Sequence, residues 1–338
     1  MRLTLARLAM ALMLLAGCDT TLESDPDGPV SDLGVDQIVA PDQGGGPDLP
    51  PADVQVADQY VAQAALRVGA LQFDADNYKD WEPCSTSSDT TCAVQNMVKE
   101  ARKQGAELVL VPDYALYPSD KMGSAELEPK VGDTPATTAP SGSILHAMAQ
   151  LAVDEGLTLV FPMVTQESTT STKMHDTMLA IDKTGKVLAK HHKLQLWTTE
   201  TSLTAGSSVT DSCFDTRAGK ACLLVGMDVG CIVTEMQTGA NCTQNAAPLL
   251  GDLLAVEKPD IVLFSVHWEN AGTTYPQWQI LSVMQKIATT FNAWVVGANT
   301  TKSPGQGGGI WMSDGTPVTT CSGNTTSTEY ASIPDKAP

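Results

Sequence analysis

From residue 65 onward, short apolar or alternating runs typical of strands are separated by longer stretches with one apolar face, typical of helices. Strands are predicted at residues 66–73, 107–112, 157–161, 177–182, 187–193, 221–225, 261–266, 293–298 and 309–312. Helices are predicted around the apolar positions within 93–101, 144–152, 249–254 and 278–291. Because strands alternate with helices and hairpins are inserted, the pattern indicates an α/β domain in which helices cover a two-layer mixed sheet.

Turn residues support the limits of these elements. Gly105 and Gly156 follow the first two helical stretches, where a glycine suits a helix C-terminal cap. Residues 183–186, Lys-Thr-Gly-Lys, separate two strands as a hairpin turn, and residues 313–315, Ser-Asp-Gly, predict a last hairpin.

The first 18 residues have the features of a targeting segment. Arg2 and Arg7 accompany an apolar run at residues 8–15, which is shorter than the roughly 20 residues that span a bilayer. The run ends in Leu-Ala-Gly-Cys at residues 15–18 and resembles the lipobox of bacterial lipoproteins. The resemblance implies an exported cell-envelope protein, periplasmic or on the outer surface, that is lipid-anchored to a membrane through Cys18. The alternative is an ordinary cleaved signal peptide with an incidental cysteine.

The segment after Cys18 is strongly acidic. Ten acidic residues and no Lys or Arg lie between Asp19 and Tyr60, in a chain of net charge −19. Residues 19–64 are also rich in Pro and Gly and poor in large apolar side chains, which predicts a disordered tether before a folded domain at 65–338. Nucleic acid is not an expected partner, because phosphate binding needs clusters of Lys and Arg.

Export implies an oxidising compartment, in which cysteines pair. Seven cysteines follow the lipobox: Cys84, Cys92, Cys213, Cys222, Cys231, Cys242 and Cys321. We expect a disulfide between Cys84 and Cys92 across a polar loop, and one between Cys213 and Cys222 beside a hairpin turn. An odd number leaves at least one cysteine free or paired between chains. No metal is expected, since the chain has no C-x-x-C pair.

Several common catalytic motifs are missing. The chain has no G-x-S-x-G nucleophile elbow and no H-E-x-x-H zinc motif. The Gly-rich residues 305–309 lack the Gly-Lys-Ser/Thr of a phosphate-binding loop.

Three segments of the chain carry a resemblance to a known family. Residues 105–113 end in Pro112-Asp113, and residues 185–194 carry Lys193 behind two histidines. Residues 219–229 end in Gly226-Met227-Asp228. The three segments occur in an order and at a spacing that resemble the carbon–nitrogen hydrolase (nitrilase) family.

The resemblance spans residues 66 to 334 approximately. The His192-Lys193 pair and the export signal are most similar to the vanin/biotinidase branch. Supporting matches occur at residues 262–265 with Trp268, at 297–300 and at 308–311. The family implies a nitrilase-type α-β-β-α sandwich, two packed mixed sheets with outer helices, which works without a cofactor and self-associates into a homodimer through outer helices.

The family's chemistry uses a glutamate as general base, a lysine that stabilises the oxyanion, and a cysteine nucleophile. By position, Asp113 stands for the glutamate, Lys193 is the lysine, and Gly226 replaces the cysteine. Loss of a nucleophile typically costs on the order of 10⁶ in turnover. The shorter side chain of Asp113 withdraws the carboxylate by about 1.2–1.5 Å, a misplacement worth roughly 10²-fold.

Other residues are expected around this site. Glu200 resembles an additional glutamate that holds the lysine and positions substrate in many relatives; the alternative is a solvated loop acid. Asp228 lies beside the empty position. His267 and Trp268 end a strand near the place where the family binds substrate, with core packing as the alternative. His191 and His192 are adjacent on a strand and should point to opposite faces.

Two functional classes remain open. One is a catalytically degenerate binding or scaffold protein whose Lys193 holds a small-molecule amide or carboxylate ligand, and in which Gly226→Ala should do little beyond steric change. The other is an active amidohydrolase, for example pantetheinase-like, with a relocated nucleophile such as Cys231, for which a disulfide with Cys242 is the competing interpretation. Gly226 favours the first class, because glycine cannot form a covalent intermediate.

Overall fold

The computed structural model describes residues 65–74, 90–116, 125–197, 199–230, 257–267, 279–301, 308–320 and 326–336. The lipobox, the acidic tether, the predicted helix at 249–254 and Trp268 lie outside these ranges, as do Cys84, Cys231, Cys242 and Cys321. In the part of the chain that the structure describes, no helix is both long and apolar enough to cross a membrane.

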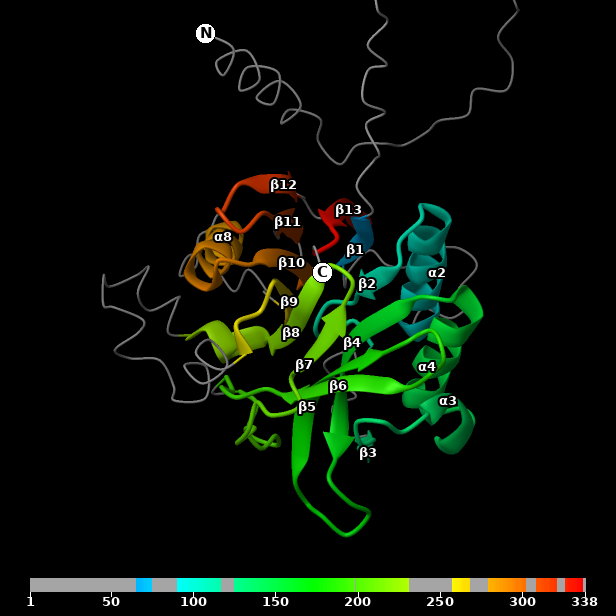
Figure 1. Ribbon diagram of the computed structural model, residues 1–338. Coiled ribbons are helices and arrows are strands. Elements are labelled where there is room, and N and C mark those ends of the chain that lie inside the picture. The colour runs from blue at the N-terminus through cyan, green and yellow to red at the C-terminus, as the bar shows by residue number, and fades with distance from the viewer. Residues whose placement is uncertain are drawn as a thin grey trace, which may run out of the picture. The chain divides into compact units, whose positions relative to one another are not determined.

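The strands form one continuous sheet that is folded over on itself (Figure 1). They are β1 (Ala65–Asp74), β2 (Leu108–Leu110), β3 (Glu126–Leu127), β4 (Thr158–Gln166), β5 (Met174–Ile181), β6 (Val187–His192), β7 (Cys213–Thr216), β8 (Gly219–Val225), β9 (Ile261–His267), β10 (Trp294–Thr301), β11 (Gly309–Trp311), β12 (Pro317–Thr320) and β13 (Ser327–Pro334). The order along the sheet is β6-β5-β4-β2-β1-β10-β9-β8-β7. At its sides, β13 pairs with β1, β3 with β4, β11 with β10, and β12 with β11.

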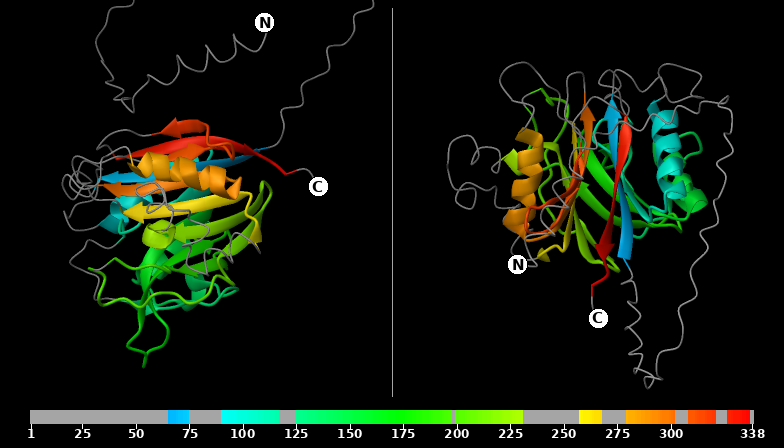
Figure 2. Two further views of the ribbon diagram at one scale, coloured as in Figure 1. Left: turned by 90° about the vertical axis from the view of Figure 1, so that its left-hand side faces the viewer. Right: turned by 90° about the horizontal axis from the view of Figure 1, so that it is seen from above.

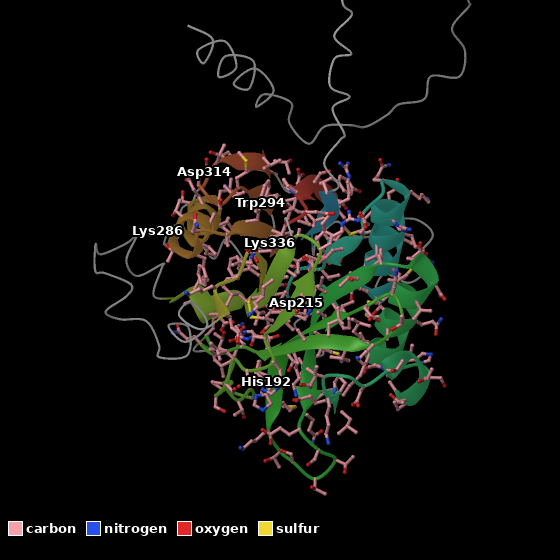
Figure 3. The ribbon with its side chains drawn as sticks, in the orientation of Figure 1. His192, Asp215, Lys286, Trp294, Asp314 and Lys336 are labelled. Atoms are coloured by element: carbon pink, nitrogen blue, oxygen red, sulfur yellow. A yellow bond between two sulfur atoms is a disulfide. The ribbon has the colours of Figure 1, made fainter. Side chains whose placement is uncertain are left out.

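The pairing of β1 with β10 joins two layers that pack face to face. Val68, Leu110 and Met178 of the first layer share one buried cluster with Leu223 and Leu263 of the second. Figure 3 shows the side chains as sticks on both layers. Burial of such apolar surface contributes about 25 cal/mol per Å² to folding, so this inner cluster holds the layers together.

Helices cover the outer faces. They are α2 (Thr90–Lys103), α3 (Pro135–Thr138), α4 (Ile144–Glu155) and α8 (Gln279–Phe291). Met97 of α2 and Met148 of α4 pack outside the first layer, whereas Met284 of α8 packs outside the second. In the right-hand view of Figure 2, α8 in orange and α2 in cyan lie on opposite outer sides of the strands. The expected α-β-β-α sandwich is therefore confirmed.

The helix caps match the sequence pattern. Gly156 ends α4 in a left-handed conformation, with φ 63° and ψ 39°. At the other end of α4, the Ser143 side chain accepts a hydrogen bond from the backbone N–H of His146. Glycine at a helix end avoids the Cβ penalty of that conformation, so the helix limit was readable from the sequence.

The sequence analysis missed β13. Its pairing with β1 runs antiparallel from Ala65 opposite Pro334 to Gln72 opposite Ser327. In its second half, the buried residues Glu329, Ala331 and Ile333 alternate with less buried ones. Only two of these are apolar, so the period-two signal is weak.

Candidate functional site

Asp113, Lys193 and Gly226 follow the ends of β2, β6 and β8 respectively. β2 is parallel to β4, and β6 runs in the direction of β4 because β5 is antiparallel to both. β8 is parallel to β9, β9 to β10, β10 to β1, and β1 to β2. The three carboxyl ends therefore share one edge of the packed layers, the place where α/β sheets bind ligands.

Lys193 lies at the centre of this edge, with its side chain only 1% exposed. Its Nζ atom is 2.5 Å from Glu200 Oε1, 3.3 Å from Asp176 Oδ2 and 3.7 Å from Asp113 Oδ2. Burial alone would lower the pKa of Lys193, but the surrounding carboxylates outweigh it and raise the pKa above its ordinary value. The lysine is thus held as an ammonium.

Two of these carboxyls are poorly compensated. Within the described ranges, the Oδ2 atoms of Asp113 and Asp176 are buried and accept no hydrogen bond. The other oxygen of Asp113 accepts a hydrogen bond from the backbone N–H of Tyr114 at 2.9 Å. Burial, followed by the charge of Asp176, raises the pKa of Asp113 well above its usual range, and burial also raises the pKa of Asp176.

Glu200 is fixed by three donors. Besides Lys193, its carboxylate accepts hydrogen bonds from the hydroxyl of Tyr114 at 2.6 Å and from the backbone N–H of Trp197 at 2.7 Å. Glu200 is only 6% exposed, so it is a buried partner of the lysine and not a solvated loop acid. This placement puts Glu200 in contact with Lys193, and its expected role in positioning substrate stays a prediction.

Gly226 completes the arrangement. It follows β8 at the start of the 3-10 helix η3 (Gly226–Val229), with φ +53°. A Cβ atom built on it would lie 2.7 Å from Lys193 Nζ and 3.5 Å from Asp113 Oδ2. The three positions singled out in the sequence therefore converge on one point, with the side chain missing at Gly226.

The same geometry sets the size of one expected effect. Gly226→Ala was expected to do little beyond steric change, and that steric change is large, because the added Cβ would lie 2.6 Å from Lys193 Cε, closer than real Cβ contacts come. The positive φ at Gly226 adds backbone strain for any other residue. The substitution must displace the buried lysine, so we now expect a clear cost.

Asp228 braces the backbone of the site. Its Oδ1 accepts hydrogen bonds from the N–H groups of Leu194 at 2.6 Å and Gln195 at 3.3 Å. Its Oδ2 accepts one from the N–H of Val225 at 3.0 Å and lies 2.6 Å from His191 Nε2. Both of its oxygens tie the segment after β6 to the segment after β8; the expected place of Asp228 in a substrate pocket stays a prediction.

The two adjacent histidines point to opposite faces, as expected. His191 is buried and its Nδ1 lies 2.7 Å from Ser212 Oγ, which extends the Asp228 network. His192 (labelled in Figure 3) stacks on His175, with ring centroids 4.1 Å apart, and its Nε2 lies 2.8 Å from Glu128 Oε2. Across the described residues, no group of three His, Cys, Asp or Glu has the arrangement of a metal site.

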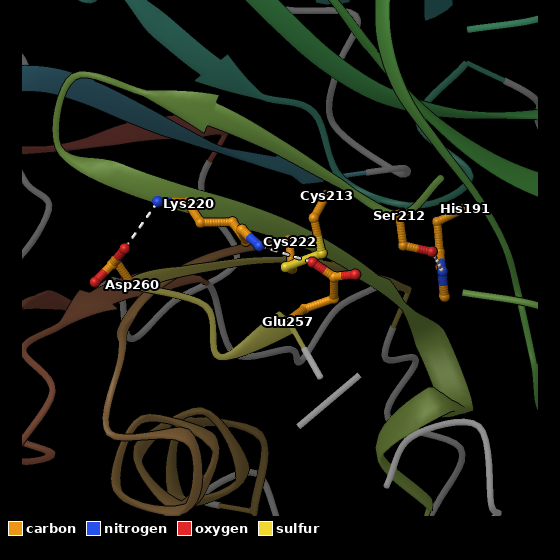
Figure 4. The surroundings of a disulfide bond; sticks show 7 residues. All are labelled: His191, Ser212, Cys213, Lys220, Cys222, Glu257 and Asp260. Carbon is orange, nitrogen blue, oxygen red and sulfur yellow. Dashed lines mark hydrogen bonds and ion pairs between the residues drawn. A yellow bond between two sulfur atoms is a disulfide. The ribbon is translucent and has the colours of Figure 1, made fainter. Parts of the chain in front are cut away.

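The disulfide between Cys213 and Cys222 is confirmed; it links the paired strands β7 and β8 (Figure 4). Because its sulfur is bonded, Cys222 cannot serve as a replacement nucleophile. Cys92 is also disulfide-bonded, and its expected partner Cys84 lies outside the described residues. Cys231 and Cys242 lie outside them as well, so their interpretation stays a prediction.

The rest of the site departs partly from the sequence analysis. The ring of His267 lies beside the ring of Tyr114, and the two ring centroids are 5.0 Å apart. Trp268 lies outside the described residues. Sequence reasoning missed Tyr114, whose φ of 60° is unusual for a non-glycine residue. It also gave no role to Asp176, which lies on β5, the first strand of the hairpin whose second strand ends just before Lys193. Only the pairing of those two strands brings Asp176 to the lysine.

Comparison with solved structures agrees on the fold. Saccharomyces cerevisiae Nit3, a member of branch 10 of the nitrilase superfamily, has a TM-score of 0.60 at 17% identity, over 80% of this chain and 90% of that chain. An amidase from Nesterenkonia sp. has a TM-score of 0.58 at 17% identity, over 81% and 92%. A mutant of the Nesterenkonia amidase, 17% identical to this chain with a TM-score of 0.56 over 81% and 92%, shows covalent addition of the acetamide moiety of fluoroacetamide at its active site cysteine.

Comparison with curated protein sequences returned no match. The carbon-nitrogen hydrolase family model matches residues 68–336, which is most of the chain. The matched region includes the strands that carry Asp113, Lys193 and Gly226. The chain belongs to the carbon-nitrogen hydrolase family.

Proposed function

We propose that the protein is a catalytically degenerate carbon-nitrogen hydrolase that binds a small-molecule amide without hydrolysing it. The observation that carries this proposal is the geometry at Gly226. Its missing side chain would point between Lys193 Nζ and Asp113 Oδ2, at 2.7 and 3.5 Å from the Cβ position. A nucleophile attached there would meet both groups, and glycine supplies none.

The chemical consequence is loss of the covalent step. A thiolate must bond to the amide carbon before the amine can leave, and removal of a nucleophile from a catalytic unit costs on the order of 10⁶ in turnover. Asp113 adds to the loss, because its carboxyl is one methylene shorter than the family's glutamate. Lys193 and Glu200 are both present and in close contact, so the site retains its buried ion pair.

The charge of the site favours a neutral ligand. Three carboxyls lie within 3.7 Å of the single ammonium of Lys193. A carboxylate ligand, which the sequence analysis also allowed, would add a further negative charge to this buried group. An amide instead offers a carbonyl oxygen to the ammonium at no charge cost.

The cellular setting follows from the sequence alone. We propose a lipoprotein of the cell envelope, exported by residues 1–18, anchored to a membrane through Cys18 and spaced from it by residues 19–64. The vanin/biotinidase-like features at His192 and Lys193 make pantetheine-like amides the first ligands to test. We also propose a homodimer, from the family resemblance.

The test compares wild type with Gly226→Cys in hydrolysis of simple amides, pantetheine-like amides and nitriles. We expect turnover at background for wild type, with acetamide binding detected by calorimetry and weakened by Lys193→Ala. Gain of turnover in Gly226→Cys would show that the remaining groups are competent. Wild-type turnover that vanishes in Cys231→Ser would overturn the proposal and identify the alternative, an active amidohydrolase with a relocated nucleophile.

A further inference from the structure

The carboxyl groups of the site could carry more negative charge than the single positive charge of Lys193 can neutralise. The carboxyls of Asp113, Asp176 and Glu200 all face Lys193 Nζ, and all three residues are at most 6% exposed. If every group were charged, the cluster would hold two uncompensated negative charges away from water. Because burial of an unpaired carboxylate is costly, such a group usually binds a proton instead.

The contacts indicate which carboxyl holds the proton. Glu200 accepts hydrogen bonds from Lys193 Nζ, Tyr114 Oη and Trp197 N, so it is well stabilised as an anion. Asp176 Oδ2 is the next nearest to the ammonium, at 3.3 Å. Asp113 Oδ2 is the most distant, at 3.7 Å, and it has no hydrogen bond from any described residue.

We infer that Asp113 is a neutral carboxylic acid in the resting protein and serves as a hydrogen-bond donor, not as a base. The proton lies on Oδ2, since Oδ1 already accepts the backbone N–H of Tyr114 at 2.9 Å. The groups that face this carboxyl are Lys193, Asp176, Glu200 and Tyr114. Burial and the two neighbouring acids raise the pKa of Asp113, and they outweigh the opposite effect of Lys193.

A protonated Asp113 changes what the site recognises. Its Oδ2–H group and the Lys193 ammonium lie 3.7 Å apart, beside the missing side chain of Gly226. Two donors at that separation can both reach a single acceptor oxygen, as in an oxyanion hole. The ligand class is therefore a neutral carbonyl compound that accepts two hydrogen bonds through one oxygen; this ligand assignment rests on the proposed function, whereas the proton on Asp113 does not.

Infrared spectroscopy of the full-length protein tests the proton without any ligand. At neutral pH we expect the C=O stretching band of a protonated carboxylic acid in wild type. The band should be lost in Asp113→Asn and kept in Asp176→Asn and in the control Glu128→Gln. Absence of the band in wild type, or its loss in Asp176→Asn alone, would overturn the inference.

A second measurement does not depend on the variants folding. Wild-type protein labelled with ¹³C at aspartate carboxyls should show the band shifted, because the protonated group is an aspartic acid and not Glu200. A band that does not shift would contradict the inference. Acetamide is then added as the probe, and binding should move the band as the Asp113 hydroxyl donates to the carbonyl.

The infrared measurement and the acetamide binding measurement test the protonated Asp113 and the amide-binding function separately. If the band is present but acetamide neither binds nor moves it, the proposed amide-binding function fails and the protonated Asp113 stands. If acetamide binds in calorimetry while wild type lacks the band, the function stands and the inference fails. A band that acetamide moves supports both.

Discussion

The Cβ position of Gly226 lies 2.7 Å from the Nζ atom of Lys193. The buried lysine thus occupies the space that a side chain at residue 226 would need. Two residues that are 33 positions apart in the sequence are held in this relationship by the Asp228 network, which connects the ends of β6 and β8. A change at either residue must therefore alter the space available to the other.

The first prediction concerns Gly226→Ala. We expect it to destabilise the protein more than Gly156→Ala, a matched control with φ +63° against +53° and no atom within 4 Å of its added Cβ. Backbone strain of about 1 kcal/mol is common to both, whereas overpacking against Lys193 adds about 1–3 kcal/mol at Gly226 alone. Urea unfolding of the two variants measures the difference. Equal losses would show that Lys193 moves aside without cost.

Much of the fold and part of the site could be predicted from the sequence. The resemblance of three segments to the family's motifs located Asp113, Lys193 and Gly226, and the structure brings these positions together because the carboxyl ends of parallel strands meet at one edge. The role of Asp176 was not readable, since it depends on register: Lys193 N donates to Asp176 O at 2.9 Å only once the hairpin has formed. The bracing contacts of Asp228 were not readable for the same reason, because position beside a site does not show which way a carboxylate points.

The second prediction concerns Asp228. Replacement by Ala leaves the backbone N–H groups of Leu194 and Val225 without their buried acceptor. Breaking a buried charged network of this kind costs about 3–5 kcal/mol, and we expect that loss in the free energy of unfolding. Glu100→Gln is the control, since its exposed ion pair with Lys103 should contribute at most about 0.5 kcal/mol. A comparable, small loss in both variants would contradict the bracing role.

The third prediction concerns the disulfide. Cys213 and Cys222 are nine residues apart in the sequence, and closing a loop of that length stabilises a protein by about 2–3 kcal/mol in the chain-entropy model. The double variant Cys213→Ala, Cys222→Ala should lose about that much in urea unfolding. A reductant should destabilise wild type by about that much more than it destabilises the double variant, in which the disulfide of Cys92 is still present to be reduced. A reductant effect of equal size in both proteins would place the stabilising bond elsewhere.

The last prediction concerns pH. A carboxyl whose pKa is raised on folding binds more protons in the native state than in the unfolded state. Its contribution to stability is therefore present at low pH and is lost as pH rises from the unfolded value, 3.8 for Asp113, towards the raised folded value. The contribution of Glu128 to stability depends on pH in the opposite direction. Burial would raise the pKa of Glu128, but hydrogen bonds from His192 and Lys190 prevail and lower it to about 2. Its contribution is present above the unfolded value of 4.5 and is lost as pH falls towards about 2.

Asp113→Asn removes the titrating group but keeps its size and a donor N–H. Relative to wild type, we expect the variant to gain stability steadily as pH rises from about 4 to neutral, because only wild type must keep a proton bound against the rising pH. Glu128→Gln, the control, should lose stability relative to wild type at neutral pH and approach it in acid. Urea unfolding of all three proteins at a series of pH values measures both trends. A difference between Asp113→Asn and wild type that does not change with pH would mean that Asp113 titrates alike in the folded and unfolded chains, and that its burial beside Asp176 leaves its charge unaffected.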